Sequence, residues 1–291
     1  MPRDYSKAVP VSDAEFRFFK RLFDYDALPL EARRDAGGVA EVYRWERVSF
    51  TAAYGRDRMA AYVFLPKDAP PPYQPVLMWP GGNAVFERSF DPNGGTFAYG
   101  PLLSFVPRSG RALVLPLYNG TYDRDDSTFS MASDGTDSTT GGRDLAIQWI
   151  KDLRRTIDYL ETRPDMDARS VGYFGTSWGG RIAPLALALE PRIHAASLYA
   201  AGLVPIGRSL PEVDPVNYLP RVKTPTVVFG GRYDTVFPYE TSQLPFFQLL
   251  GAPAPNKKHV VYTASHTVPM DSVALETLIW FDKYLGPVGK R

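Results

Sequence analysis

Short apolar runs alternate with helix-like segments through most of this chain, and this alternation constrains the fold more than any other feature of the sequence. We expect buried strands at residues 76–79, 112–115, 171–174, 194–199, 226–229 and 259–262. We expect helices at residues 97–105, 145–160, 182–189, 240–250 and 271–284. Short apolar strands that alternate with helices predict an α/β fold with a mostly parallel central sheet and helices on both faces.

The first part of the chain has a different pattern. Residues 41–51 and 59–65 alternate in hydrophobicity and are rich in β-branched and aromatic side chains, which predicts a hairpin of antiparallel edge strands. Before it, Ser12-Asp13-Ala14-Glu15 is typical of a helix start, and aromatic residues follow at helical spacing. We therefore expect residues 1–40 to be an N-terminal helical extension packed on the body, and residues 41–291 to be a single domain.

Composition excludes several classes of function. Lys plus Arg (33) nearly balance Asp plus Glu (32), so no overall field attracts nucleic acid or an anionic membrane surface. The absence of cysteine excludes disulfides, thiolate metal sites and a cysteine nucleophile. The first ten residues lack the apolar core of a signal peptide, and no apolar stretch is long enough to span a membrane. We expect a cytoplasmic protein, and the sequence leaves its oligomeric state open.

The segment Gly175-Thr176-Ser177-Trp178-Gly179 joins an expected strand to an expected helix. This is the pattern of a nucleophile elbow, in which a tight turn pushes a serine hydroxyl out of the sheet. Glycines on either side leave room for the crowded backbone. The new helix begins with unpaired N–H groups that favour developing negative charge. Ser177 is therefore a candidate nucleophile.

A serine nucleophile needs a base and a carboxylate that orients the base. Of the three histidines, His194 and His259 open their strands, whereas His266 follows a strand and lies at the carboxyl end of the sheet. Asp234 follows the strand at 226–229, again at the carboxyl end. The order Ser177, Asp234, His266 is that expected of a triad on a parallel sheet.

An acyl-transfer site also needs donors for the oxyanion. The N–H of Trp178 is one candidate, because this residue follows the nucleophile. The loop Pro80-Gly81-Gly82-Asn83 follows a strand, and we expect the second donor to be the N–H of Gly82 or, next, of Asn83.

Two long segments, residues 86–99 and 121–142, leave the carboxyl ends of expected strands, where open α/β sheets bind ligands. The carboxylates of the second segment lack the spacing of an EF-hand, so we expect no metal there. Aromatic side chains that are candidates for contact with a substrate are Phe86, Phe90, Tyr122, Phe129 and Phe237.

Together, Gly175-Thr176-Ser177-Trp178-Gly179-Gly180, Gly230-Gly231-Arg232-Tyr233-Asp234 and Ser265-His266 resemble the α/β-hydrolase superfamily. The branch that the chain resembles contains dienelactone hydrolases, acetyl-xylan esterases and prolyl-oligopeptidase-like enzymes. The resemblance implies an α/β-hydrolase fold, Ser177 as nucleophile, His266 as general base and then acid, Asp234 as its orienting carboxylate, and no cofactor. Dienelactone hydrolases proper use a cysteine nucleophile, which this chain lacks. Only about twenty residues, 202–221, separate the expected strands at 194–199 and 226–229, which predicts a catalytic domain without a large cap.

Three functions are consistent with these residues. The first is a carboxylesterase that cleaves a small to medium ester through an acyl-enzyme on Ser177. The second is a serine aminopeptidase or acylaminoacyl peptidase, because the same triad cleaves amides. The third is a non-catalytic binding protein on a hydrolase scaffold, because a fold does not determine a function.

Overall fold

A single nine-stranded sheet runs through the protein and is seen in the computed structural model, which describes residues 3–93, 100–124 and 138–288. The strands are β1 (Arg33–Val39), β2 (Tyr43–Thr51), β3 (Arg58–Pro66), β4 (Pro75–Trp79), β5 (Ala112–Leu117), β6 (Val171–Thr176), β7 (Ile193–Tyr199), β8 (Thr226–Gly231) and β9 (Lys257–Tyr262). Their order is β1-β2-β3-β5-β4-β6-β7-β8-β9. The pairs from β1 to β3, and β3 with β5, are antiparallel, whereas β4 to β9 run parallel.

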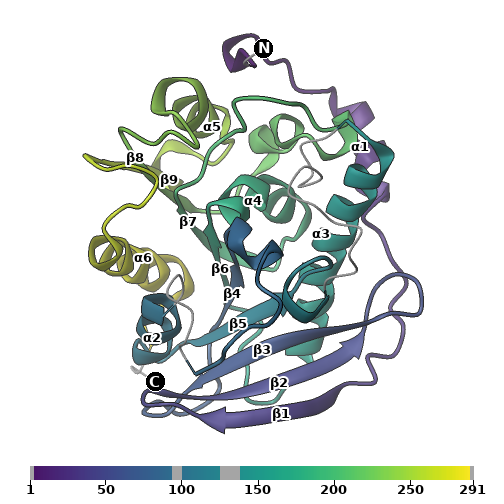
Figure 1. Cartoon of the computed structure of the whole chain (residues 1–291), viewed down its shortest axis with the longest axis vertical. Coiled ribbons are helices and arrows are strands. Elements are labelled where there is room, and N and C mark those ends of the chain that lie inside the picture. Colours follow the sequence, from purple (N-terminus) through teal and green to yellow (C-terminus); the bar gives the residue numbers. More distant parts are fainter. Residues whose placement is uncertain (1–2, 94–99, 125–137, 289–291) are drawn as a thin grey trace.

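Helices cover both faces of this sheet (Figure 1). They are α1 (Asp13–Arg21), α2 (Gly100–Arg108), α3 (Thr140–Glu161), α4 (Trp178–Leu189), α5 (Leu244–Leu249) and α6 (Met270–Leu285). Helices α3 and α4 contribute Trp149 and Ile182 to one apolar core. Helices α2 and α6 contribute Val106 and Phe281 to the core on the opposite face. The mostly parallel sheet between two helical layers is thereby confirmed.

Strand β1 is an element that the sequence pattern did not predict. Its residues, Arg-Arg-Asp-Ala-Gly-Gly-Val, do not alternate in hydrophobicity, and most of them are exposed. The strand is stabilised by pairing with β2 and by the Trp45 ring, which lies over Gly38. A Cβ at position 38 would lie only 2.7 Å from this ring. Residues 33–39 are therefore sheet and not helix, which corrects the helical description of residues 1–40. The domain division at residue 40 stays a prediction.

The N-terminal helix starts as predicted. Ser12 caps α1 and forms a reciprocal capping box with Glu15. Its Phe16 ring meets the Tyr218 ring edge-on at 5.2 Å, and Phe23, just after the helix, is buried against the same tyrosine. The helix therefore packs on the body through aromatic contacts.

The remaining boundaries shift by a few residues. Helix α2 is described from Gly100 to Arg108, three residues past the predicted end, and residues 97–99 lie outside the described residues. Helix α3 is capped by the Thr139 side chain, which accepts from the Gly142 N–H at 3.1 Å. The helix predicted within residues 240–250 consists of a short π-helix, η8 (Tyr239–Gln243), followed directly by α5. Within the described residues, no helix has the length and apolar character required to cross a membrane.

Candidate active site

Ser177 lies between the end of β6 and the start of α4 and has backbone angles of φ 50° and ψ −98°. A non-glycine residue with positive φ is uncommon, and such strain persists only where the surroundings enforce it. Here the Ser177 N–H donates to the Tyr199 carbonyl at 2.8 Å, and the Ser177 carbonyl accepts from the Arg181 N–H at 2.9 Å. This conformation is the strained turn that the motif predicts.

Two glycines make the turn possible by allowing the backbone to pack closely. A Cβ on Gly179 would lie 2.4 Å from the Trp79 carbonyl oxygen, and a Cβ on Gly175 would lie 2.6 Å from the Gly179 carbonyl oxygen. Because the obstacles are backbone atoms, no side-chain rotation could relieve either clash. Any larger residue would force the first turn of α4 away from β4 and β6.

The structure brings the three predicted catalytic side chains together. The His266 Nε2 lies 2.8 Å from the Ser177 Oγ, and the His266 Nδ1 lies 2.8 Å from the Asp234 Oδ2. The three residues follow β6, β8 and β9, so all three lie at the carboxyl edge of the parallel sheet. Residues far apart in the chain therefore meet because parallel strands end at the same edge.

Asp234 is held so that its charge is compensated. Its side chain is fully buried, and its Oδ1 accepts from the backbone N–H groups of Val236 and Phe237 at 2.8 and 2.9 Å. A buried carboxylate requires such partners. With Oδ1 occupied, Oδ2 is directed to the Nδ1–H of His266, which leaves Nε2 free to accept the Ser177 hydroxyl proton.

The candidate oxyanion donors follow the neighbouring strands β4 and β6. The loop after β4 forms a short 3₁₀ helix, η2 (Gly82–Val85), so the N–H of Gly82 is at a helix start, as is that of Trp178 in α4. The Gly179 N–H donates to the Pro80 carbonyl at 3.1 Å and is therefore occupied. The side-chain amide of Asn83 donates to Glu87 Oε1 at 2.7 Å. Trp178, Gly82 and Asn83 remain predicted donors.

Residues 112–267, more than half of the chain, match the model of the dienelactone hydrolase family. The chain belongs to this family. A curated relative, a putative carboxymethylenebutenolidase from Synechocystis sp., is 31% identical over 96 residues, which are 33% of this chain and 39% of the relative. The match thus spans well under two thirds of that protein.

Several solved structures share the fold of this protein. Acetyl xylan esterase 1 from Thermoanaerobacterium sp. aligns with a TM-score of 0.72 at 17% identity, covering 95% of this chain and 96% of its own. The acetyl xylan esterase from Paenibacillus sp. R4 aligns at 0.69 and 17% identity, covering 96% of each chain. A putative dienelactone hydrolase from Klebsiella pneumoniae aligns at 0.57 and 20% identity, covering 82% and 99%. These likenesses show an α/β-hydrolase fold.

The other two histidines of this family member lie away from Ser177. His194 is exposed near the start of β7. His259 lies within β9 and contacts the rings of Tyr239 and Phe247. Burial, together with the positive charge of Arg232, lowers the pKa of His259 to about 4. Its Nε2 is buried without a hydrogen-bond partner, which is compatible with a neutral ring.

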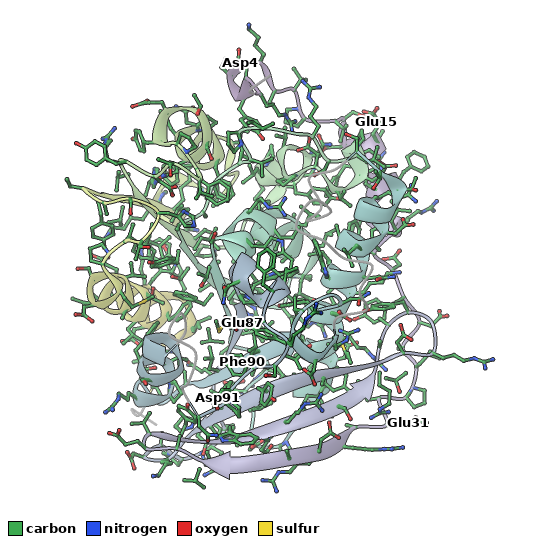
Figure 2. All side chains as sticks on the ribbon, viewed as in Figure 1. Asp4, Glu15, Glu31, Glu87, Phe90 and Asp91 are labelled. Carbon is green, nitrogen blue, oxygen red and sulfur yellow. The ribbon has the colours of Figure 1, made fainter. Side chains whose placement is uncertain are left out.

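The aromatic residues predicted to contact a substrate differ in exposure. Phe86 is 67% exposed just after η2. Tyr122 is only 1% exposed and packs edge-on against Phe90 at 5.4 Å, while Phe90 itself lies against the ring of Tyr62 in β3. In Figure 2, Phe90 is labelled between Glu87 and Asp91, in the lower half of the view and above the antiparallel strands. Tyr122 and Phe90 are therefore packed in the core, and their contact with a substrate stays a prediction.

Phe237 is also mostly buried, but its ring lies 5.7 Å from that of His266. It therefore packs beside the site, and its contact with a substrate stays a prediction. Phe129 lies outside the described residues.

No group of three or more metal-ligating side chains occurs within the described part of the chain. Of the acidic residues in the second long segment, Asp123 is described and pairs with Arg47 at 2.6 Å. Asp125, Asp126, Asp134 and Asp137 lie outside the described residues.

Two residues that support the triad loops, Gln243 and Tyr199, belong to no sequence pattern that points to the site. The Gln243 side chain lies in η8 and donates from Nε2 to the carbonyls of Gly231 and Phe237, at 2.9 and 2.7 Å, on either side of Asp234. The Tyr199 hydroxyl contacts the backbone of Val268, two residues after His266. A polar residue at a strand end or in a helix is too common to single out by pattern.

Proposed function

We propose that this protein is a serine carboxylesterase that hydrolyses small to medium carboxylic esters through an acyl-enzyme on Ser177. The observation that carries the proposal is the continuous chain of 2.8 Å contacts from Ser177 Oγ through His266 to Asp234, at a strained turn that starts a helix. Membership of a hydrolase family supports the same chemistry.

In the first half of the reaction, the Ser177 Oγ attacks the ester carbonyl while His266 Nε2 takes the hydroxyl proton. The carbonyl oxygen gains the negative charge and accepts from the N–H of Trp178 and from an N–H of the Gly82-Asn83 segment. The tetrahedral intermediate collapses with cleavage of the ester C–O bond. His266 passes its proton to the leaving alkoxide, and the acyl group stays on Ser177.

In the second half, water replaces the alcohol. His266 Nε2 removes a proton from the water as its oxygen attacks the acyl carbon, and the second intermediate collapses with return of that proton to Ser177 Oγ. The carboxylic acid leaves. Asp234 stays ionised throughout, orienting the imidazole and stabilising its charged form.

Short acyl esters are the first substrates to test, because two of the similar solved structures are acetyl xylan esterases. The test compares the unaltered protein with Ser177→Ala on chromogenic esters of increasing acyl length and on matched aminoacyl anilides. We expect ester turnover by the unaltered protein and a loss on the order of a millionfold in the variant. Near-normal ester turnover by the variant would refute the proposal, and faster cleavage of anilides would identify an amidase instead.

An active-serine phosphonate gives a measurement that does not depend on the choice of ester. It should label the unaltered protein at Ser177 and leave the Ser177→Ala variant unlabelled. A protein that neither turns over esters nor reacts with the phosphonate would be a binding protein on this fold.

A further inference from the structure

Tyr199 is the last residue of β7, the strand between the one that leads to Ser177 and the one that leads to Asp234. It is 8% exposed. Its backbone carbonyl accepts the Ser177 N–H at 2.8 Å, and the N–H of the next residue, Ala200, donates to Phe229 in β8 at 2.9 Å. The backbone of Tyr199 is thus fixed between the two strands, directly beside the nucleophile.

The side chain of the same residue reaches the loop at residues 263–269, which carries His266 and is called here the histidine loop. The Tyr199 hydroxyl donates to the Val268 carbonyl and accepts from the Val268 N–H, both at 3.1 Å. A phenol can make both bonds at once because it has one proton and free lone pairs. Val268 is buried, so its backbone groups need these partners. Burial also raises the pKa of the Tyr199 hydroxyl, which keeps it protonated as a donor.

The histidine loop is anchored on its other side by different contacts. The Tyr233 N–H donates to the Ala264 carbonyl at 2.9 Å, and the Arg232 N–H donates to the Tyr262 carbonyl at 2.8 Å. Both anchors precede His266, and both come from the loop that carries Asp234. The Tyr199 hydroxyl supplies an anchor that follows His266 and comes from the strand beside Ser177.

We propose that Tyr199 is a positioning residue that holds His266 in register with Ser177, its carbonyl fixing the nucleophile turn and its hydroxyl fixing the histidine loop. This inference rests on the proposed esterase function. Tyr199 acts through His266 and carries no proton in the reaction. Movement of the loop by about 1 Å would lengthen the 2.8 Å contact between Nε2 and Oγ, and displacements of that size can cost a hundredfold in rate.

The test is Tyr199→Phe, which keeps the ring and the backbone bond to Ser177 and removes only the hydroxyl. Tyr218→Phe is the matched control, because Tyr218 is also buried and donates its hydroxyl to a backbone carbonyl, that of Glu212, but it packs against Phe16 and Phe23 on the N-terminal side. We expect Tyr199→Phe to lower kcat by about 10- to 100-fold with KM within threefold, and Tyr218→Phe to change kcat by less than threefold.

Equal kcat values for Tyr199→Phe and the unaltered protein, with Ser177→Ala inactive, would overturn the inference and leave the esterase proposal intact. Full activity of Ser177→Ala would instead overturn the esterase proposal. If Tyr199→Phe does not fold, hydrogen exchange in the unaltered protein still tests the anchor. By hydrogen exchange, the amide of Val268 should be as protected as those of β7, and exchange as fast as in an open loop would contradict the anchor.

Discussion

Replacing Asp234 by Asn should reverse the hydrogen bond that orients His266. The Asn carbonyl would keep the two backbone donors of Val236 and Phe237 that now bond to Oδ1, because this leaves no buried N–H unpaired. The side-chain NH₂ would then face His266 Nδ1, where Oδ2 now lies at 2.8 Å. Since two donors cannot share one bond, Nδ1 would lose its proton and Nε2 would gain one.

An imidazole protonated at Nε2 cannot accept the proton of the Ser177 hydroxyl. The same exchange in other triads lowers kcat by about 10⁴, which corresponds to about 5 kcal/mol of transition-state stabilisation. The free energy of unfolding should change by less than about 2 kcal/mol, because the shape and the backbone bonds are retained. The variant should therefore be folded but nearly inactive.

The assay is kcat and KM on the best chromogenic ester, with urea unfolding as the measure of stability. Asp167→Asn is a suitable control, since Asp167 is also buried but bonds to Arg169 and Ser170 before β6, at the opposite edge of the sheet. The control should keep its activity within a few-fold. An Asp234→Asn variant with kcat within tenfold of the unaltered protein would show that Asp234 does not set the tautomer.

Three further predictions concern packing, loop support and pH. Gly179→Ala should destabilise the fold by about 2 kcal/mol or more and abolish turnover, because its Cβ would lie 2.4 Å from the Trp79 carbonyl; an unchanged urea midpoint would contradict this. Gln243→Met should leave two carbonyls beside Asp234 without a donor from this side chain, at a cost of about 1–3 kcal/mol in unfolding free energy, with a fall in kcat of about tenfold; full activity would argue against a role in loop support. The pKa of His259 is about 4 in the folded protein and 6.5 in the unfolded chain, so between these pH values the unfolded chain binds more protons than the folded protein. The free energy of unfolding should therefore decrease as the pH falls below 6.5, by at most about 2 kcal/mol at pH 5. His259→Phe should reduce this dependence in urea unfolding at pH 7.5 and 5, and an unchanged dependence would rule out His259 as its source.

Much of the fold could be predicted because the sequence signals for its strands and helices lie within the segments that form them. Apolar runs bounded by glycine and proline mark the parallel strands, and the Ser12 to Glu15 capping box marks the start of α1 within the segment that forms it. Strand β1 has no such signal, since its stability comes from pairing with β2 and from the Trp45 ring. An edge strand of charged and small residues is defined by its partner.

The candidate site also has features that the sequence predicts and features that only the tertiary structure shows. The sequence by itself determined which residues lie at the carboxyl edge, because a loop that follows a parallel strand must lie there, and this placed Ser177, Asp234 and His266 on one side of the sheet. Only the tertiary structure decided that their atoms lie 2.8 Å apart, that Tyr122 is buried in the core, and that Tyr199 and Gln243 support the loops. Those features depend on distances between residues far apart in the chain. Such distances are set by the packing of strands and helices, which no local pattern encodes.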